Sequence, residues 1–542
     1  MSFSSPGTRH GAPIIASLLL WLACLIPAGD TVAETLEETL PRLADRSFAV
    51  KQAAIESIAA SPDERALNIL VALAAGDLYT RTQTPSVVLG LATSAGRRLT
   101  DPLTGADLGE ATPGAAKKII LNNAMRVALR VAIASRRLSS PDPAERLSAA
   151  REMRGDTSPA AVAALSAQLE REQDAEVRAA ITLALAVARL GSSEPSTRLE
   201  AVAALEDSLY PEARNALRPV AESDPDPEVR KAAAKTLTGI EQRLAWNARA
   251  ETLFFGLSLG SVLVLAAIGL AITFGVMGVI NMAHGELMML GAYTAYLVQS
   301  ALPGWIDYSL FLAIPAAFIV SGLFGIAIER TVIRFLYGRP LETLLATFGI
   351  SLILQQLVRT LISAQNVVVQ NPSWMSGAWS INPALALTYN RLFILLFALL
   401  VFAALLLILK RTALGLEVRA VSQNRAMARA MGVRSERVDA LTFGLGAGIA
   451  GVAGVALSQL TNVGPNMGQA YIIDSFMVVV FGGVGNLWGT LVAGMSLGVA
   501  NKLMEPWAGA VLAKILVLVF IILFIQKRPR GLFPQRGRAA EG

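Results

Sequence analysis

TLFFGLSLGSVLVLAAIGLAITFGVMGVINMAHG, residues 252–285, contains no acidic or basic side chain. A transmembrane helix needs about 20 predominantly apolar residues, so this run accommodates one span and the start of a second. Further apolar segments follow at 287–301, 310–328, 343–362, 392–409, 440–460, 472–484, 490–503 and 511–525. The second half of the chain is therefore predicted to be a polytopic α-helical membrane domain.

The composition of the 542-residue chain agrees with this prediction. Mean hydropathy is +0.51 and 54% of the residues are hydrophobic, against 16% charged, which is too apolar for a set of soluble domains. Residues 251–542 carry 19 Lys and Arg against 11 Asp and Glu, whereas residues 1–250 carry 28 against 30. The net charge of +6 thus lies between hydrophobic segments rather than on a basic soluble face, which predicts contact with a lipid membrane and no nucleic-acid partner.

The distribution of Lys and Arg predicts the orientation of the membrane segments. Most of those in the second half lie at 330–339, 410–437 and 527–538, whereas loops 363–390 and 461–471 have none. Short loops rich in Lys and Arg face the cytosol, so the C-terminal tail, 527–542, is placed inside. With the N-terminal domain outside, the number of crossings is odd. It is nine if 472–484 spans the bilayer, and seven if that segment and its Gly-rich successor re-enter from one side.

The N-terminus is predicted to be an export signal. A short apolar run at 14–26 precedes small and polar residues, a pattern typical of a signal peptide over 1–33 that is cleaved after Ala33. A lipoprotein signal ending at Cys24 is the alternative, but Trp21 fits poorly at the third position before it. Because Cys24 is the single cysteine, neither a disulfide framework nor a Cys-based metal site is expected.

Residues 34–248 are predicted to form a periplasmic helical repeat domain. DPAERLSAA at 142–150 is followed by the similar DAEVRAAIT at 174–182, and EPSTRLEAV at 194–202 is followed, at the same sequence offset, by DPEVRKAAA at 226–234. Each motif supplies a capping Asp or Glu, an Arg and a stripe of small apolar residues, as paired helices of an α-solenoid do. HEAT-type repeats are therefore expected, with a plain helical bundle as the alternative.

One stretch of this domain, residues 79–116, does not follow the helical pattern. It contains GRRLTDPLTGADLGEATPG at 96–114, whose Gly, Pro and Asp content is typical of turns. A loop or hairpin insertion that serves as a docking surface is expected there.

Catalytic motifs are scarce. The chain has no G-x-x-x-x-G-K-[ST] phosphate loop and only two histidines, His10 and His284, so neither nucleotide hydrolysis by that machinery nor a His-based metal or catalytic site is expected. No cofactor is implied. A transport role, rather than an enzyme activity, is the prediction.

The first candidate translocation element is FGVMGVINMAHGELMMLGAY, residues 274–293. Asn281, His284 and Glu286 are polar groups among apolar ones, and such groups are costly in hydrocarbon unless they face partners or water. They are interpreted as part of the translocation pathway. The alternative is that this is a helix turn at the cytoplasmic side, which His284 and Glu286 only cap and anchor.

The second candidate element is FGGVGNLWGTLVAGMSLG, residues 481–498. Gly482 and Gly483 would permit a re-entrant turn, and Asn486 would offer an amide to a polar solute. Close helix packing explains the glycines equally well. Asp474, just before this element, is expected to be an interfacial anchor rather than a proton relay.

Three of these stretches carry a family resemblance. FGVMGVINMAHGELMMLGAY, RTALGLEVRAVSQNRAMARAMGVRSERVDALTFGLGAGIAGVAG at 411–454 and FGGVGNLWGTLVAG at 481–494 resemble LivH-type permeases of branched-chain amino-acid ABC importers, as does the terminal RPRGLFP. The resemblance covers 252–534. Within the family, the N-terminal extension, with TDPLTGADLG and NNAMR, is similar to the UrtB-type permeases of urea importers, which implies urea as the solute.

The resemblance also implies partners and a role for the basic segment at 410–437. ABC permeases present a cytoplasmic coupling helix to the ATPase, and an Ala-rich stretch followed by Gly occupies the comparable place here, with Arg residues that can pair with acidic rims. The implied coupling residues are Arg425, Ala426, Ala428, Arg429, Ala430 and Gly432. The alternative is an amphipathic helix on anionic headgroups.

The expected assembly is a bacterial inner-membrane importer. It contains a second, LivM-like permease in a heterodimer, two cytoplasmic ABC ATPases and a periplasmic substrate-binding protein. The rival functions are a branched-chain amino-acid or short-amide permease and, from another class, a membrane-anchored periplasmic scaffold.

Overall fold

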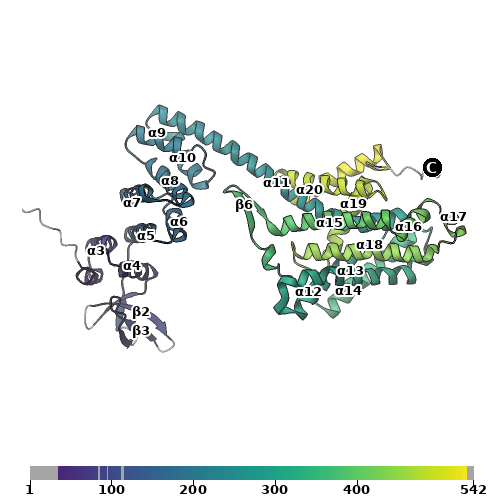
Figure 1. Cartoon of the computed structure of the whole chain (residues 1–542), viewed down its shortest axis with the longest axis horizontal. Coiled ribbons are helices and arrows are strands. Elements are labelled where there is room, and N and C mark those ends of the chain that lie inside the picture. Colours follow the sequence, from purple (N-terminus) through teal and green to yellow (C-terminus); the bar gives the residue numbers. More distant parts are fainter. Residues whose placement is uncertain (1–34, 83–85, 94–95, 112–114, 534–542) are drawn as a thin grey trace, which may run out of the picture. The chain divides into compact units, whose positions relative to one another are not determined.

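The computed structural model describes residues 35–82, 86–93, 96–111 and 115–533. The predicted signal at 1–33 and the last part of the predicted tail at 527–542 lie outside these ranges. The chain divides into two compact units, Met1–Glu241 and Gln242–Gly542, and Figure 1 shows their helices and strands.

The first unit begins with short helices around a small apolar core. A capping box at Thr35 and Glu38 starts the described chain. The core contains Leu43, Ile55 and Leu70, each fully buried. The elements are α2 (Leu36–Thr39), the 3-10 turn η2 (Leu40–Ala44), α3 (Phe48–Ala60), α4 (Arg65–Ala75) and, after the strands, α5 (Asn123–Leu138).

The stretch expected to be a loop or hairpin insertion does contain hairpins, β2–β3 and β3–β4, but they belong to a larger five-stranded antiparallel sheet in the order β4-β3-β2-β1-β5. In the hairpin between β3 and β4, Asp101 accepts hydrogen bonds from the backbone of Leu103 and Thr104, and Gly105 has φ 70°. The Gly and Asp residues do form turns, as their composition indicates, but the strands between them are short and rich in Gly, Arg and Lys. The strands are β1 (Leu78–Arg81), β2 (Val87–Thr93), β3 (Gly96–Thr100), β4 (Asp107–Ala111) and β5 (Ala116–Lys118).

The helices after α5 form two copies of a three-helix unit. Pro195, Pro211 and Pro227 begin α9, α10 and α11, and their offset from the first residues of α6, α7 and α8 is the same in all three cases. The similar motifs found in the sequence are closer together than this, because they begin the first and third helices of the same three-helix unit. The bounds are α6 (Pro143–Glu152), α7 (Pro159–Arg171), α8 (Ala175–Arg189), α9 (Pro195–Ala204), α10 (Pro211–Ser223) and α11 (Pro227–Met277).

The Arg of each repeated motif has the same structural role. Arg146, Arg178, Arg198 and Arg230 each donate from Nη1 to the backbone carbonyl six residues earlier, fixing the turn that precedes the helix. In the first helix of each unit, the Arg also forms a two-bond ion pair: Arg146 with Glu172, and Arg198 with Asp224, with all four N–O distances 2.8 Å. The Arg therefore joins the first helix of a unit to the end of its second.

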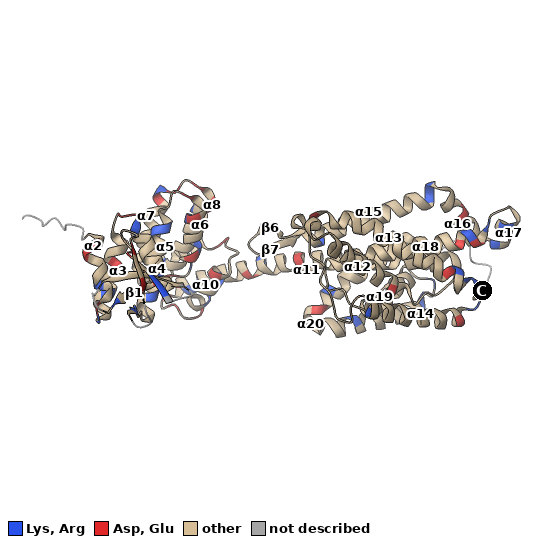
Figure 2. Ribbon diagram, turned by 90° about the horizontal axis from the view of Figure 1, so that it is seen from below, with Lys and Arg blue, Asp and Glu red and all other residues tan. Residues whose placement is uncertain are grey.

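The second unit consists almost entirely of apolar helices. Among the described residues, six helices are long and apolar enough to cross a membrane. Figure 2 shows α13, α15 and α18 almost entirely tan, with charged residues gathered around α16 and α17. The helices are α11 and then α12 (His284–Ala301), α13 (Ile306–Thr331), α14 (Pro340–Leu361), α15 (Tyr389–Arg411), α16 (Ala413–Gln423), α17 (Arg425–Ala430), α18 (Ser435–Ser458), α19 (Met467–Gly482) and α20 (Leu487–Lys527). Short 3-10 turns η3 (Pro303–Trp305), η4 (Ile333–Phe335) and η5 (Ser373–Met375), and a hairpin of β6 (Ala378–Asn382) with β7 (Leu385–Thr388), complete it.

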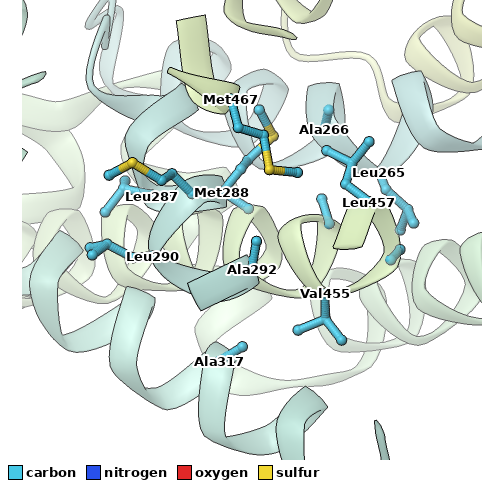
Figure 3. Close-up of a cluster of buried hydrophobic side chains, with 14 of the residues drawn as sticks. Leu265, Ala266, Leu287, Met288, Leu290, Ala292, Ala317, Val455, Leu457 and Met467 are labelled. Carbon is cyan, nitrogen blue, oxygen red and sulfur yellow. The ribbon is translucent and has the colours of Figure 1, made fainter. Parts of the chain in front are cut away.

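Helices α12 and α18 form the centre of this unit, and glycines bring them together. A Cβ on Gly454 would collide with the carbonyl oxygen of Met288, and one on Gly291 would collide with the backbone of Gly451. Around this crossing, Leu287, Met288 and Leu457 are buried, and Figure 3 shows where their side chains lie. Small residues permit this approach, because helices in a bilayer associate by close packing rather than by hydrophobic exclusion from water.

Helix α20 is bent back on itself. Gly509 has φ 75° and ψ 162°, which interrupts the helix. Gly482 packs against Gly489 in the first arm, while the neighbouring Phe481 ring lies 4.8 Å from that of Phe524 in the second. A straight helix of 41 residues would be about 60 Å long, so both ends can reach the same place only if the arms run antiparallel. The segments predicted at 490–503 and 511–525 lie in these two arms.

Loops from several helices meet at one end of the unit. Val367 and Val463 exchange backbone hydrogen bonds of 2.8 and 2.9 Å, so the two loops without Lys or Arg are joined. The Gln299 side chain donates to the carbonyl of Gln370, and the Trp374 indole donates to that of Asp307. Exposed Trp305 and Tyr308 stand at the same turn, as interfacial aromatic residues do.

Candidate translocation site

The turn between α11 and α12 brings two of the predicted pathway residues into the protein core. Helix α11 ends at Met277, Gly278 has φ 68°, and α12 begins at His284. The Asn281 Oδ1 accepts from the backbone N–H of Ala283, and the His284 Nε2 lies 2.8 Å from the carbonyl oxygen of Ala266. Asn281 Nδ2 and His284 Nδ1 are buried and have no hydrogen-bond partner in the described part of the chain.

Glu286 is the centre of a buried polar cluster. Its Oε1 accepts from the hydroxyl of Ser351 at 2.9 Å and from the amide of Gln355 at 2.8 Å. Its Oε2 is buried without a partner among the described residues. A Cβ on Gly468 of α19 would come within 2.6 Å of that oxygen. Glu286 is only 1% exposed. Its Oε2 is therefore a buried acceptor that lies next to the backbone of Gly468.

The sequence analysis missed the partners of Glu286, which belong to a polar face of α14. Thr343, Thr347, Ser351 and Gln355 recur at every fourth position, and all are buried. Thr347 accepts from the backbone N–H of Met282 at 3.1 Å, so the same face also holds the turn before α12. The four-residue spacing of these polar side chains is visible in the sequence, and residues at i, i+4, i+8 and i+12 share one helix face. The sequence does not show what that face contacts.

The other predicted pathway residues lie in the turn between α19 and α20. Gly482 packs against the backbone of Gly489, and Gly483 has φ 104°. Asn486 caps α20, accepting from the N–H of Gly489, and donates from Nδ2 to the carbonyl oxygen of Phe533 at 3.2 Å. Both side-chain groups of Asn486 are therefore used within the fold.

The C-terminal segment is paired to this turn. Leu532 and Phe533 donate from their backbone to the carbonyls of Phe481 and Gly482, at 2.9 and 3.1 Å. The end of the described chain is therefore hydrogen-bonded to the Gly-rich turn. Asp474, the neighbouring carboxylate, accepts from Lys514 of the second α20 arm at 3.0 Å.

The predicted coupling segment contains two short helices, α16 and α17, followed by Gly432 at φ 89°. Ala428 is buried against Val418, Val421 and Val438, while Ala426, Ala430 and Gly432 are exposed. The largest exposed apolar side chains of α17 and its C-cap are Met427, at 59%, and Met431, at 78%, and the sequence analysis did not single them out.

The two Arg residues of α17 are engaged within the chain. Arg425 forms a two-bond ion pair with Asp439 of α18, and the Nε of Arg429 donates to the hydroxyl of Ser435 at 2.6 Å. The guanidinium of Arg425 also lies 5.0 Å from the ring centroid of Tyr337. These contacts hold α17 to α18 and to the loop before α14.

The Tyr337 side chain connects this ion pair to α13. Its hydroxyl donates to Oε1 of Glu329, a carboxylate that is 1% exposed. Burial, followed by the charges of Asp439 and Glu329, raises the pKa of the Tyr337 phenol above its usual value, which keeps it protonated as a hydrogen-bond donor.

The arrangement of apolar helices around a buried, mostly uncharged face, with a basic segment at one end, is that of a polytopic membrane permease. Residues 252–525 match the sequence profile of the family described as "Branched-chain amino acid transport system / permease component". Residues 186–248 match HEAT repeats, in agreement with the predicted helical repeat domain. The chain belongs to the branched-chain amino acid transport system permease family.

Curated relatives agree with this assignment. The LivH permease of Salmonella typhimurium is 30% identical over 292 residues, which are 52% of this chain and 94% of the relative. LivH of Escherichia coli is 30% identical over 294 residues, with the same coverage of both chains. BraD of Pseudomonas aeruginosa is 31% identical over 291 residues, again 52% and 94%. No solved structure matches significantly.

Proposed function

We propose that the chain is the inner-membrane permease subunit of an ATP-binding cassette importer that translocates urea into the cytoplasm. The observation that carries the proposal is the buried face of hydroxyls and amides on α14, which ends at a Glu286 oxygen without a partner among the described residues. Urea is neutral and carries both N–H donors and a carbonyl acceptor. A face of hydroxyls and amides with one free acceptor suits such a solute without requiring a counter-charge.

The pathway is assigned to the cluster of Asn281, His284 and Glu286. These residues lie on α12 or the turn before it, and Glu286 and the turn contact α14, whose lipid-side residues Leu345 and Ile353 are exposed. Gly482, Gly483 and Asn486 are assigned a supporting role, because they connect α19, α20 and the end of the described chain. Non-helical backbone inside a transporter is tolerated where it faces protein or a wet cavity, and both turns meet that condition here.

A branched-chain amino-acid permease is the second candidate, favoured by the names of the relatives and by one basic residue. Arg359 lies four residues after Gln355 and donates to Asn466 at 2.7 Å. Such a guanidinium could instead bind the carboxylate of an amino acid. Against this candidate, the N-terminal unit lies outside the matched permease region, and it resembles the extension of urea importers.

The proposed partners follow from the coupling segment. Met427 and Met431 expose apolar surface beside the small residues Ala426, Ala430 and Gly432, which suits insertion into a groove on a cytoplasmic ATPase. Two such ATPases, a LivM-like second permease and a periplasmic substrate-binding protein complete the proposed importer. The repeat domain is assigned to the periplasm.

Uptake into vesicles that contain the full set of subunits tests the proposal. ATP-dependent accumulation of radiolabelled urea is the expected result. Accumulation of leucine but not urea would establish the second candidate instead, and accumulation of neither would favour a membrane-anchored scaffold.

Cysteine labelling tests the proposed orientation, with the repeat domain in the periplasm and the coupling segment in the cytosol. Trp507, 92% exposed, lies near the bend between the two α20 arms and should face the periplasm. In a variant without Cys24, Trp507→Cys should react with a membrane-impermeant maleimide in intact cells, whereas Met431→Cys should react only after lysis. The opposite pattern would contradict the orientation.

A further inference from the structure

The first unit contains a basic cleft that the transport proposal does not use. Its volume is about 900 Å³, and it lies between the end of α4, strand β5 and the first half of α5. Its lining includes three basic residues, Lys118, Arg126 and Arg130, and no acidic one. A cleft lined by one sign of charge concentrates ligands of the opposite sign.

These three basic side chains have no partner within the described residues. All are exposed, and none forms a hydrogen bond or ion pair there. Other arginines of this unit, such as Arg65 with Asp63 and Arg98 with Asp107, are paired with nearby carboxylates. Three basic side chains without a counter-charge among the described residues therefore line this one cleft.

The local fold adds to this positive potential. Arg126 and Arg130 are one turn apart on α5, so they project from the same face. The first turn of α5, which begins at Asn123 in the cleft, has no acidic residue, and a helix N-terminus carries partial positive charge. A Cβ on Gly76 would overlap the Nζ of Lys118, so a glycine makes room for that cation.

The cleft continues along the solenoid. A second cavity of about 390 Å³ shares Val127 and Arg130 with the first, and a third of about 510 Å³ shares Gly155 and Thr157 with the second. A small anion would occupy only the basic end. The elongated surfaces of α-solenoids bind extended segments, and exposed Ile120 and Val127, at 69% and 46%, offer apolar contacts beside the cations.

We propose that this cleft binds an extended, acidic polypeptide segment of a soluble partner protein. Carboxylates of the segment contact Lys118, Arg126 and Arg130, and an apolar side chain covers Ile120 and Val127. The second and third cavities include Glu152, Asp156 and Glu212 in their linings, so the part of the segment that follows them towards α10 is not acidic. Binding of this kind weakens as salt screens the charges.

The test uses the full chain in nanodiscs of zwitterionic lipid and a short fluorescent peptide rich in Glu with interspersed Leu. Fluorescence anisotropy should show binding that weakens as NaCl rises. The double variant Arg126→Glu, Arg130→Glu should bind at least about tenfold more weakly, while Arg171→Glu, an exposed control on α7 outside the cleft, should bind as the wild type does. Ile120→Asp should also weaken binding. Hydrogen exchange of α5 must match wild type in each variant.

Three results would overturn the proposal. One is a peptide affinity unchanged by the double variant. Another is displacement of the peptide by inorganic phosphate more effectively than by chloride at equal ionic strength, which would indicate a small-anion site. The third is flotation with anionic phospholipid vesicles that depends on Arg126 and Arg130, which would indicate a lipid surface.

Discussion

Arg425 and Asp439 form a two-bond ion pair, with Nη1 2.6 Å from Oδ2 and Nη2 2.9 Å from Oδ1. The Asp439 side chain is 1% exposed and that of Arg425 is 31% exposed. This pair is the strongest polar connection between α17 and the central helix α18. Movement imposed on α17 by a partner would reach α18 through it.

The first prediction concerns this ion pair. Arg425→Ala leaves the Asp439 carboxylate buried without its partner, which is costly, and α17 should lose its fixed position. We expect ATP-driven uptake to fall at least about tenfold while ATP hydrolysis continues. Arg434→Ala, at an exposed position, is the control. The reciprocal exchange Arg425→Asp with Asp439→Arg should recover part of the uptake, and full uptake by Arg425→Ala would rule out the connection.

The second prediction concerns the exposed methionines. Met431→Glu places a charge on the proposed contact with the ATPase without entering the core, so co-purification of the ATPase with the permease should decrease. Ala428→Asp is a less specific probe, because Ala428 is buried and its substitution would disturb α17 itself. Undiminished co-purification with Met431→Glu would move the contact elsewhere.

The third prediction concerns Glu286. Glu286→Gln keeps an acceptor for Ser351 and Gln355 but replaces one oxygen by a donor, so solute uptake should fall while the amount of folded protein in the membrane remains. Ser351→Ala removes one of the two hydrogen bonds to Glu286 and should lower uptake less, because Gln355 still donates to the carboxylate. Normal uptake by Glu286→Gln, measured in the vesicle assay, would leave Glu286 a purely structural residue.

The fourth prediction concerns the crossing of α12 and α18. Gly454→Val would force the new side chain against the Met288 carbonyl, so the helices would have to separate. The yield of folded protein in detergent, measured by size-exclusion chromatography, should drop. Gly349→Val on α14 is the matched control, since a Cβ there meets nothing within 4 Å. Equal yields for the two variants would contradict the close packing.

The fifth prediction concerns the pH dependence of the solenoid. The hydrogen bond from Arg146, opposed in part by burial, lowers the pKa of Glu172 from 4.5 to about 2. A lowered folded-state pKa stabilises the fold above pH 4.5, and this contribution is lost as pH falls towards 2. Hydrogen-exchange protection at the start of α8, corrected for intrinsic rates, should therefore decrease over that range by about tenfold.

Two variants check this assignment. Glu172→Gln should flatten the pH dependence, whereas Glu170→Gln, a neighbouring substitution on α7, should preserve it. If Glu172→Gln lost hydrogen-exchange protection at low pH as the wild type does, the effect would belong to another carboxylate. Asp224, whose pKa is lowered by its hydrogen bond to Arg198, should behave similarly in the second unit of the repeat.

Much of the fold could be predicted because it depends on local patterns. The apolar segments, the break between 490–503 and 511–525, and the helix starts at Asp142 and Asp174 follow from composition and capping. The sheet at 78–118 could not, because its strands are short and depend on pairing. The three-helix period was hidden because the first and third helices of a unit begin with similar motifs.

The site was only half predictable for the same reason. Asn281, His284 and Glu286 were recognisable as polar residues in an apolar context. The α14 residues that contact Glu286 and the turn before α12 are about 65 residues distant in sequence. Asn486 was expected to face a solute, and its amide instead caps α20 and binds Phe533. The Arg425 guanidinium, expected to meet a partner protein, is bound to Asp439. In each case the residue was polar and the deciding contact was tertiary.

The constant displacement between α6–α8 and α9–α11 has an evolutionary consequence. Two adjacent copies, whose first two helices have equal lengths and whose Arg-carboxylate connection is the same, indicate an in-frame duplication of one cassette. A further copy of the three-helix unit could be inserted between α8 and α9, where one unit ends and the next begins. Its Arg would pair with a carboxylate of the same unit, so no contact with a neighbouring unit would be lost. The solenoid can therefore lengthen by whole repeats without any change in the sequence of the transport domain that follows it.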